Sequence, residues 1–105
     1  MNMKTAKSRY KTVYIVQSHV AWGPDFDEVR VFPSLKSAAK CYNSSVKATA
    51  DELEGEYTKD DLIHAADIRK FEGKSFLIGW DYEDNDGDVH TVILFTQGIR
   101  VTSTN

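Results

Sequence analysis

The sequence predicts an α+β fold: a four-stranded antiparallel sheet with one long and one short helix packed on one face, in the order β-β-α-α-β-β. Segments rich in β-branched and aromatic residues lie towards both ends of the chain, as expected for strands. Between them, apolar residues recur every three or four positions, which indicates helix. The length of 105 residues fits one domain. We therefore expect a flexible basic segment over residues 1–9, a single domain over 10–102 and a tail over 103–105.

Two strands are predicted in the first third of the chain, at residues 12–17 and 28–32. Both segments are rich in β-branched and aromatic residues, and the second alternates between polar and apolar positions. Gly23 and Pro24 between them are a strong turn signal, so the two strands should run antiparallel. The connection is long for a hairpin, and we expect it to project from the sheet.

A long helix of about five turns is predicted next. Ser34 is its expected N-cap, because a serine hydroxyl accepts a hydrogen bond from a free backbone N–H of the first turn. Gly55 is expected to end the helix, since glycine favours the left-handed backbone found there. The apolar face should comprise Leu35, Ala39, Tyr42, Val46, Ala50 and Leu53.

A short second helix is predicted after Thr58. Thr58 and Asp61 match a capping box in which Asp replaces the usual Glu. The buried face of this helix would consist of Leu62, Ala65, Ala66 and Ile68. Two interpretations stay open for residues 67–72, which fit either the end of the helix or a short strand.

Residues 75–82 and 89–95 predict the last two strands, and the second is apolar enough for a central position in the sheet. Asp86 and Gly87 between them are the preferred pair for a two-residue type I′ turn. Such a turn would fix the register of the hairpin. The predicted cross-strand pairs are Trp80 with Ile93, Ile78 with Phe95, and Tyr82 with Thr91.

This register also predicts the two faces of the hairpin. Trp80 and Ile93 would pack against the long helix, while His90 would lie opposite Glu83 on a face of mixed polarity. The apolar residues of that mixed face would need cover from a second copy of the chain, in a homodimer, or from the N-terminal segment. They are Leu77, Val92 and Leu94.

The composition favours a globular protein in a reducing, cytoplasmic compartment. Cys41 is the only cysteine, which rules out an internal disulfide and a cysteine-based zinc site. No apolar run approaches the roughly 18 residues of a membrane span. The basic N-terminus lacks the apolar stretch of a secretory signal. We therefore expect no membrane association.

The net charge of −3 conceals an uneven distribution. Lys4, Lys7, Arg9 and Lys11 lie in the first eleven residues, which contain no acid. The rest of the chain therefore carries 9 of the 13 basic residues and all 16 acidic residues. A body of that charge repels nucleic-acid phosphates and favours basic partners, so direct nucleic-acid binding is the less favoured prediction.

A cluster of carboxylates in the last hairpin is the first candidate site. A calcium-binding EF-hand would need acidic ligands at loop positions 1 and 12, where this sequence has Tyr82 and Ile93. The cluster is therefore interpreted as a solvated hairpin tip, as a negative lobe that docks on a basic protein surface, or as an imitation of nucleic-acid phosphates. Its members are Asp81, Glu83, Asp84, Asp86 and Asp88.

Two further groups of residues are candidate contacts. Trp22 and Phe26 flank the predicted turn after the first strand, where aromatic side chains either anchor an interface or plug the loop. Lys36, Lys40 and Lys47 lie on one side of the long helix and, with the basic N-terminus, would reach phosphates. The sequence shows no catalytic residue, cofactor-binding motif or metal-ligand spacing.

The strand–strand–helix cassette of residues 14–39 resembles one found in many small phage-encoded proteins, some anti-CRISPR inhibitors among them. It contains Tyr14-Ile-Val and Glu28-Val-Arg-Val-Phe-Pro-Ser-Leu-Lys-Ser-Ala-Ala39. The resemblance implies a class of small acidic accessory proteins that bind and block a target, and it transfers no functional residue.

The leading hypothesis is a non-enzymatic protein-interaction domain, in the form of a phage or mobile-element inhibitor. Its partner would be a host protein or ribonucleoprotein complex that handles nucleic acid in defence, and no cofactor is expected. The alternative is a small nucleic-acid-binding protein that uses the basic N-terminus and the lysines of the long helix. A small enzyme with an unrecognised site is the third hypothesis.

Overall fold

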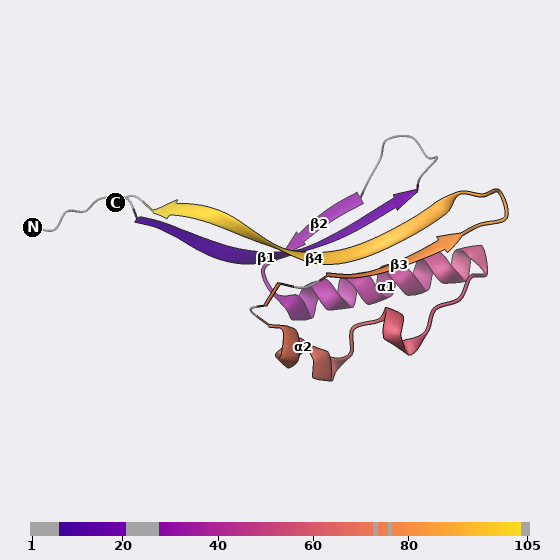
Figure 1. Ribbon diagram of the computed structural model, residues 1–105, viewed down its shortest axis with the longest axis horizontal. Helices are drawn as coiled ribbons and strands as arrows, with labels where there is room; N and C mark the ends of the chain where they lie inside the picture. Colours follow the sequence, from indigo (N-terminus) through magenta and orange to yellow (C-terminus); the bar gives the residue numbers. More distant parts are fainter. Residues whose placement is uncertain (1–6, 21–27, 73, 76, 104–105) are drawn as a thin grey trace, which may run out of the picture.

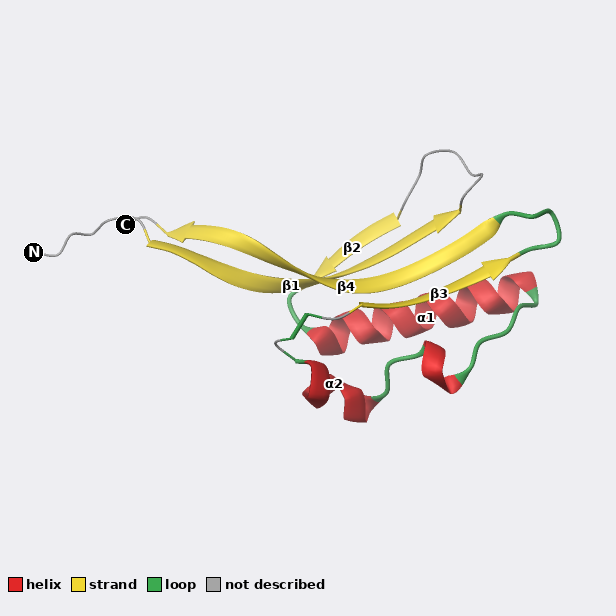
Figure 2. Ribbon diagram, in the orientation of Figure 1, coloured by secondary structure: helices red, strands yellow, loops and turns green. Residues whose placement is uncertain are grey.

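A computed structural model of the protein describes residues 7–20, 28–72, 74–75 and 77–103. Within these ranges, antiparallel strands in the order β2-β1-β4-β3 form one sheet, and the helices lie on one of its faces (Figures 1 and 2). The predicted fold class and the central position of the last strand are confirmed. The elements are β1 (Lys7–Val20), β2 (Glu28–Phe32), α1 (Leu35–Leu53), the 3-10 helix η1 (Lys59–Asp61), α2 (Ala65–Phe71), β3 (Leu77–Glu83) and β4 (Val89–Ser103).

β1 and β4 are much longer than predicted, and they pair with each other along the whole of β1. β2 reaches only as far as Tyr14, and β3 begins opposite Phe95. Residues 7–13 and 97–103 therefore form a two-stranded ribbon, here called the arm, that projects beyond the rest of the sheet (Figure 1).

The arm corrects two predicted boundaries. Residues 7–9 were expected in a flexible segment but belong to β1, and residue 103 was expected in the tail but ends β4. The reason is that each segment finds its backbone hydrogen-bond partner in the other, and a pairing between distant segments cannot be read from residues 7–9 alone.

The turn between β3 and β4 is not the predicted type I′ turn. Gly87 has a φ of 86°, whereas Asp86 does not have a positive φ. Asp84 N donates to Asp88 O at 2.9 Å, and Gly87 N donates to Asp84 O at 3.0 Å. These bonds close a three-residue loop, residues 85–87, of the kind that combines a type I turn with a left-handed glycine.

The extra loop residue shifts the register by one, so that the observed pairs are Trp80 with Val92, Ile78 with Leu94, and Tyr82 with His90. A shift of one residue exchanges the two faces of a strand. Val92 and Leu94 are therefore core residues, 1 % and 0 % exposed, and Ile93 lies on the opposite face. The predicted faces of β4 are wrong, and so is the place of Val92 and Leu94 on the predicted homodimer surface, whereas Leu77 is exposed as predicted.

α1 follows its predicted start and its predicted apolar face. The Ser34 hydroxyl accepts a hydrogen bond from Ser37 N at 3.3 Å, which confirms the cap. Leu53 is half-buried, because the last turn of the helix extends to the edge of the core. The buried residues of the helix are Leu35, Ala38, Ala39, Tyr42, Val46 and Ala50.

The end of α1 differs from the prediction in one residue. Glu54, not Gly55, has the left-handed backbone, with a φ of 56°. Gly55 is needed for close packing instead, since a Cβ there would lie 3.0 Å from ring atoms of Tyr82. The Tyr82 ring stacks on Trp80, whose Nε1 donates to Glu56 O at 3.0 Å. The chain is thus held against β3 as it leaves the helix.

Two side chains of α1 fasten the next segment to the core. Asn43 Nδ2 donates to Ile63 O at 2.8 Å, and Asn43 Oδ1 accepts from Ile63 N at 3.0 Å. The Tyr42 hydroxyl donates to Asp61 O at 2.7 Å. These bonds satisfy backbone groups that have no partner in regular secondary structure.

The predicted capping box of Thr58 and Asp61 is present, with Asp61 Oδ2 accepting from Thr58 N at 2.7 Å. It caps η1, however, and α2 begins only at Ala65. The later start rotates the helix, so Ala65 and Ala66 are exposed and Ile63 is buried in their place. The predicted burial of the two alanines is therefore wrong, and α2 runs to Phe71, which resolves the open choice in favour of helix.

Tyr42→Phe should lower the free energy of unfolding by about 1–2 kcal/mol, because the carbonyl of Asp61 loses its hydrogen-bond donor. Burial raises the pKa of Tyr42, and the nearby carboxylate of Asp61 raises it further. The stabilisation is therefore complete below the ordinary tyrosine pKa of about 10 and is lost as pH rises above it. Denaturant titrations at pH 8 and pH 11 should show the difference between the two proteins shrinking at the higher pH.

The exposed Tyr57 provides the control. Tyr57→Phe should leave the free energy of unfolding within a few tenths of a kcal/mol of the parent protein. An equal cost for the two substitutions would contradict the role assigned to Tyr42.

Candidate functional site

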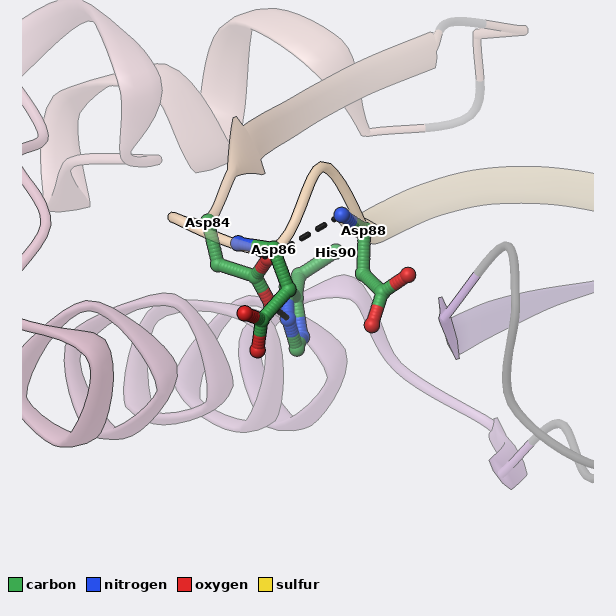
Figure 3. Close-up of polar contacts among 4 residues, drawn as sticks. All are labelled: Asp84, Asp86, Asp88 and His90. Carbon is green, nitrogen blue, oxygen red and sulfur yellow. Dashed lines mark hydrogen bonds and ion pairs between the residues drawn. The ribbon is translucent and has the colours of Figure 1, made fainter.

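The acidic turn between β3 and β4 is organised by the carboxylate of Asp84. Asp84 Oδ1 accepts from the backbone N–H groups of Asp86 and Asp88 at 2.9 and 3.0 Å. Asp84 Oδ2 accepts from His90 Nε2 at 2.8 Å, and Figure 3 shows the imidazole beside this carboxylate. The bond from His90 lowers the pKa of Asp84, as do the two backbone N–H groups, while burial opposes the shift. Asp84 is therefore a structural residue of the turn.

The five predicted carboxylates separate into three groups. Asp84 is turned inward, so it is not available to a partner. Asp81 and Glu83 alternate along β3 with the buried Trp80 and therefore point away from the helices. Asp86 lies in the loop itself, and Asp88 directly follows it (Figure 3). The predicted pairing of His90 with Glu83 is wrong, because the shifted register pairs His90 with Tyr82, and its imidazole then contacts Asp84.

The face of the sheet opposite the helices is not covered by any described segment. α1, η1 and α2 all lie on the other side (Figure 2). Three of its apolar side chains are strongly exposed, Val29 at 53 %, Val31 at 59 % and Leu77 at 70 %. We call this surface the open sheet face; its apolar residues are Ile15, Val29, Val31, Leu77, Ile93 and Phe95.

Charge is distributed unevenly along the open sheet face. Asp81 and Glu83 lie beside the end of the face nearest the acidic turn. At the other end is the arm, whose strands contain four basic residues and no acidic residue. The basic residues are Lys7, Arg9, Lys11 and Arg100. Lys11, paired with Ile99, lies on the open sheet face, whereas Arg100, paired with Tyr10, lies on the other face of the arm. The apolar centre thus lies between an acidic end and a basic end.

A groove between α2 and β3 is the best candidate for an enzyme site. It has a volume of about 360 Å³ and includes His64 and Asp67 in its wall. Asp67 Oδ2 accepts from the backbone N–H of His64 at 3.0 Å, and His64 Nε2 lies 2.7 Å from the backbone carbonyl of Lys59. Both side chains are engaged by the backbone at the start of α2, so they do not form a nucleophile–base pair.

The remaining candidates are not brought together. Lys36, Lys40 and Lys47 are exposed on α1, and the arm is a separate part of the molecule (Figure 1). Trp22 and Phe26 lie outside the described residues. Among the residues that the structure describes, no three histidine, cysteine or acidic side chains are arranged to hold a metal ion.

Sequence reasoning placed Leu77 on an uncovered sheet face, but it missed the other apolar residues of the open sheet face and the arm. A signal for the arm exists in residues 96–103, where Ile99 and Val101 alternate with polar residues beyond the predicted end of the last strand. None of the described helices combines the length and apolar character needed to cross a bilayer. No protein-family model, no curated protein and no solved structure matches the chain.

Asp84→Ala should lower the thermal unfolding midpoint more than Asp86→Ala, because only Asp84 accepts hydrogen bonds within the turn. The pKa of Asp84 is lowered, so its ionised carboxylate stabilises the folded state. This stabilisation is complete above the ordinary carboxyl pKa of about 3.9 and is lost as pH falls below that value. Midpoints measured from pH 7 to pH 3 should therefore converge for Asp84→Ala and the parent protein. Parallel curves would contradict the assignment.

Proposed function

We propose that this chain is a non-enzymatic protein-interaction domain that binds protein through the open sheet face. The observation that carries the proposal is the set of strongly exposed apolar side chains on one continuous surface, Val29, Val31 and Leu77 among them. Contiguous apolar surface of this kind on a monomer is typical of an interface. The polar ends of the surface supply the rim that such interfaces have.

The acidic turn is a second contact surface in this proposal. Asp86 and Asp88 have no side-chain hydrogen bond or ion pair among the described residues, while Asp84 fixes the loop that carries them. A loop that is already ordered loses little entropy on binding. Two carboxylates on such a loop suit a basic protein surface.

The specific form that we favour is a cytoplasmic phage or mobile-element inhibitor, which binds and blocks a host complex that handles nucleic acid in defence. The resemblance of residues 14–39 to small phage-encoded inhibitors supports this form. The excess of 16 acidic over 13 basic residues also supports it, because complexes that bind nucleic acid present basic surfaces.

A second candidate function is nucleic-acid binding through the arm. A two-stranded ribbon fits the major groove of B-DNA, and all the charged residues of the arm strands are basic. Lys36, Lys40 and Lys47 on α1 would supply a separate set of phosphate contacts. Affinity for a duplex should then fall steeply as salt rises, whereas a flat salt response would exclude the arm as a nucleic-acid site.

Val31→Lys combined with Leu77→Lys should strongly weaken protein binding at the open sheet face, since it places a charge at each end of the apolar cross-strand row that Ile15 and Phe95 complete. The measurement is a pull-down from nuclease-treated host lysate to which untagged chain has been added, with the tagged chain as bait. The recovered amounts of host protein and of untagged chain should each fall at least about tenfold, which corresponds to about 1.4 kcal/mol. Both positions are exposed in the monomer, so the fold should be retained, which circular dichroism checks.

The matched control is Ala48→Lys combined with Ala65→Lys, which adds the same charge at exposed helix positions. Equal recovery with both double variants would overturn the proposed use of the open sheet face.

Asp86→Lys combined with Asp88→Lys tests the acidic turn separately. In this variant, the tagged chain should no longer recover a basic host protein but should still recover the untagged chain.

A further inference from the structure

The open sheet face and the arm both lack cover within the described chain. All the described helices lie on one side of the sheet, so no described segment covers the other side (Figure 2). The arm consists of two strands with no further neighbour, and an isolated two-stranded ribbon is marginally stable in water. Ile99, which continues the open sheet face along the arm, is 39 % exposed. A surface that covered both features would stabilise both.

We propose that this cover is a second copy of the chain, packed face to face and antiparallel, so that the arm of each copy lies over the acidic end of the other. The proposal rests on the proposed function, because it names the protein that occupies the open sheet face. The chain itself has the complementary chemistry: an apolar centre, a basic end and an acidic end.

The strand register supports a two-fold arrangement. Along β4, the apolar centre of the face lies at Ile93 and Phe95. Val89, paired with Glu83, and Ile99, paired with Lys11, are equally distant from the midpoint between them. At about 3.4 Å per residue, each end lies about 17 Å from that midpoint. A two-fold axis across the strands therefore brings the acidic end of one copy to the arm of the other.

The acidic end and the basic end of a single copy cannot contact each other. The acidic turn and the arm lie at opposite ends of the molecule (Figure 1). Lys11 therefore cannot reach Glu83 of its own chain, whereas an isologous dimer makes the contact twice. Electrostatic complementarity of this kind selects orientation and register more than it adds affinity.

The area of the face shows why the arm is needed. Four strands spaced about 4.8 Å apart over seven residues give a flat area on the order of 450 Å². A stable interface buries about 800 Å² on each partner. The four-stranded part is therefore too small alone, and the two strands of the arm extend the contact. Sheets packed in this way keep their strand directions within about 30° of each other.

The mass of the purified protein in solution tests the proposal. Light scattering coupled to size-exclusion chromatography, at low salt and over a series of concentrations to about 100 μM, should give twice the chain mass of 11.9 kDa. Val31→Lys with Leu77→Lys should give a monomer, and Ala48→Lys with Ala65→Lys should remain a dimer. Monomer mass for the parent protein at every concentration would overturn the proposal, as would a dimer that survives Val31→Lys with Leu77→Lys.

A charge exchange tests the orientation. Glu83→Lys and Lys11→Glu should each raise the dimer dissociation constant about fivefold at low salt, and less at high salt because exposed charges are screened. Combining the two should restore part of the loss. If the losses of dimerisation free energy from the two single substitutions simply add in the double variant, the antiparallel arrangement is overturned.

The same measurements separate this proposal from the proposed function. A monomer that still captures a host protein through the open sheet face would overturn the second copy and leave the proposed function intact. A monomer whose capture of protein is unaffected by Val31→Lys with Leu77→Lys would overturn both.

Discussion

The carboxylate of Asp84 is the constraint on which the rest of the sheet depends. By accepting from two backbone N–H groups of the loop and from His90, it stabilises a turn of three residues rather than two. The turn sets the register, and the register decides which residues of β4 meet the helix. In this register Val92 and Leu94 are core residues, and the half-buried Phe95 lies on the open sheet face. The identity of the open sheet face therefore follows from the chemistry of the acidic turn.

The helical layer explains why only one face is covered. The chain leaves α1 at Gly55 under the ring of Tyr82, and Asn43 then holds Ile63 by both of its backbone groups. These contacts keep residues 55–63 on the side of the sheet where α1 lies. No described segment crosses to the opposite face, so its apolar residues have no cover within the described chain.

The sequence was sufficient for elements whose signal is local. α1 could be predicted because its apolar spacing and Ser34 act within a few residues. The hairpin register could not, because Asp86 and Gly87 suit two turn types and the choice depends on side-chain bonds to Asp84. The arm could not be predicted from residues 7–11, whose charge is typical of a tail and whose pairing partner is distant. The individual carboxylates were identified from the sequence, but their separation into inward and outward groups required the register.

The pairing of β1 with β4 has a consequence for synthesis of the chain. These two strands are neighbours at the centre of the sheet, yet β2, α1, η1, α2 and β3 are all translated between them. On the ribosome, β1 can form only its short hairpin with β2 until β4 has emerged. Its other edge stays exposed during that interval, and unpaired edges are where nascent chains aggregate. Closure of the sheet is thus a late and non-local event, which favours slow folding and makes this chain a suitable client for chaperones that shield strand edges.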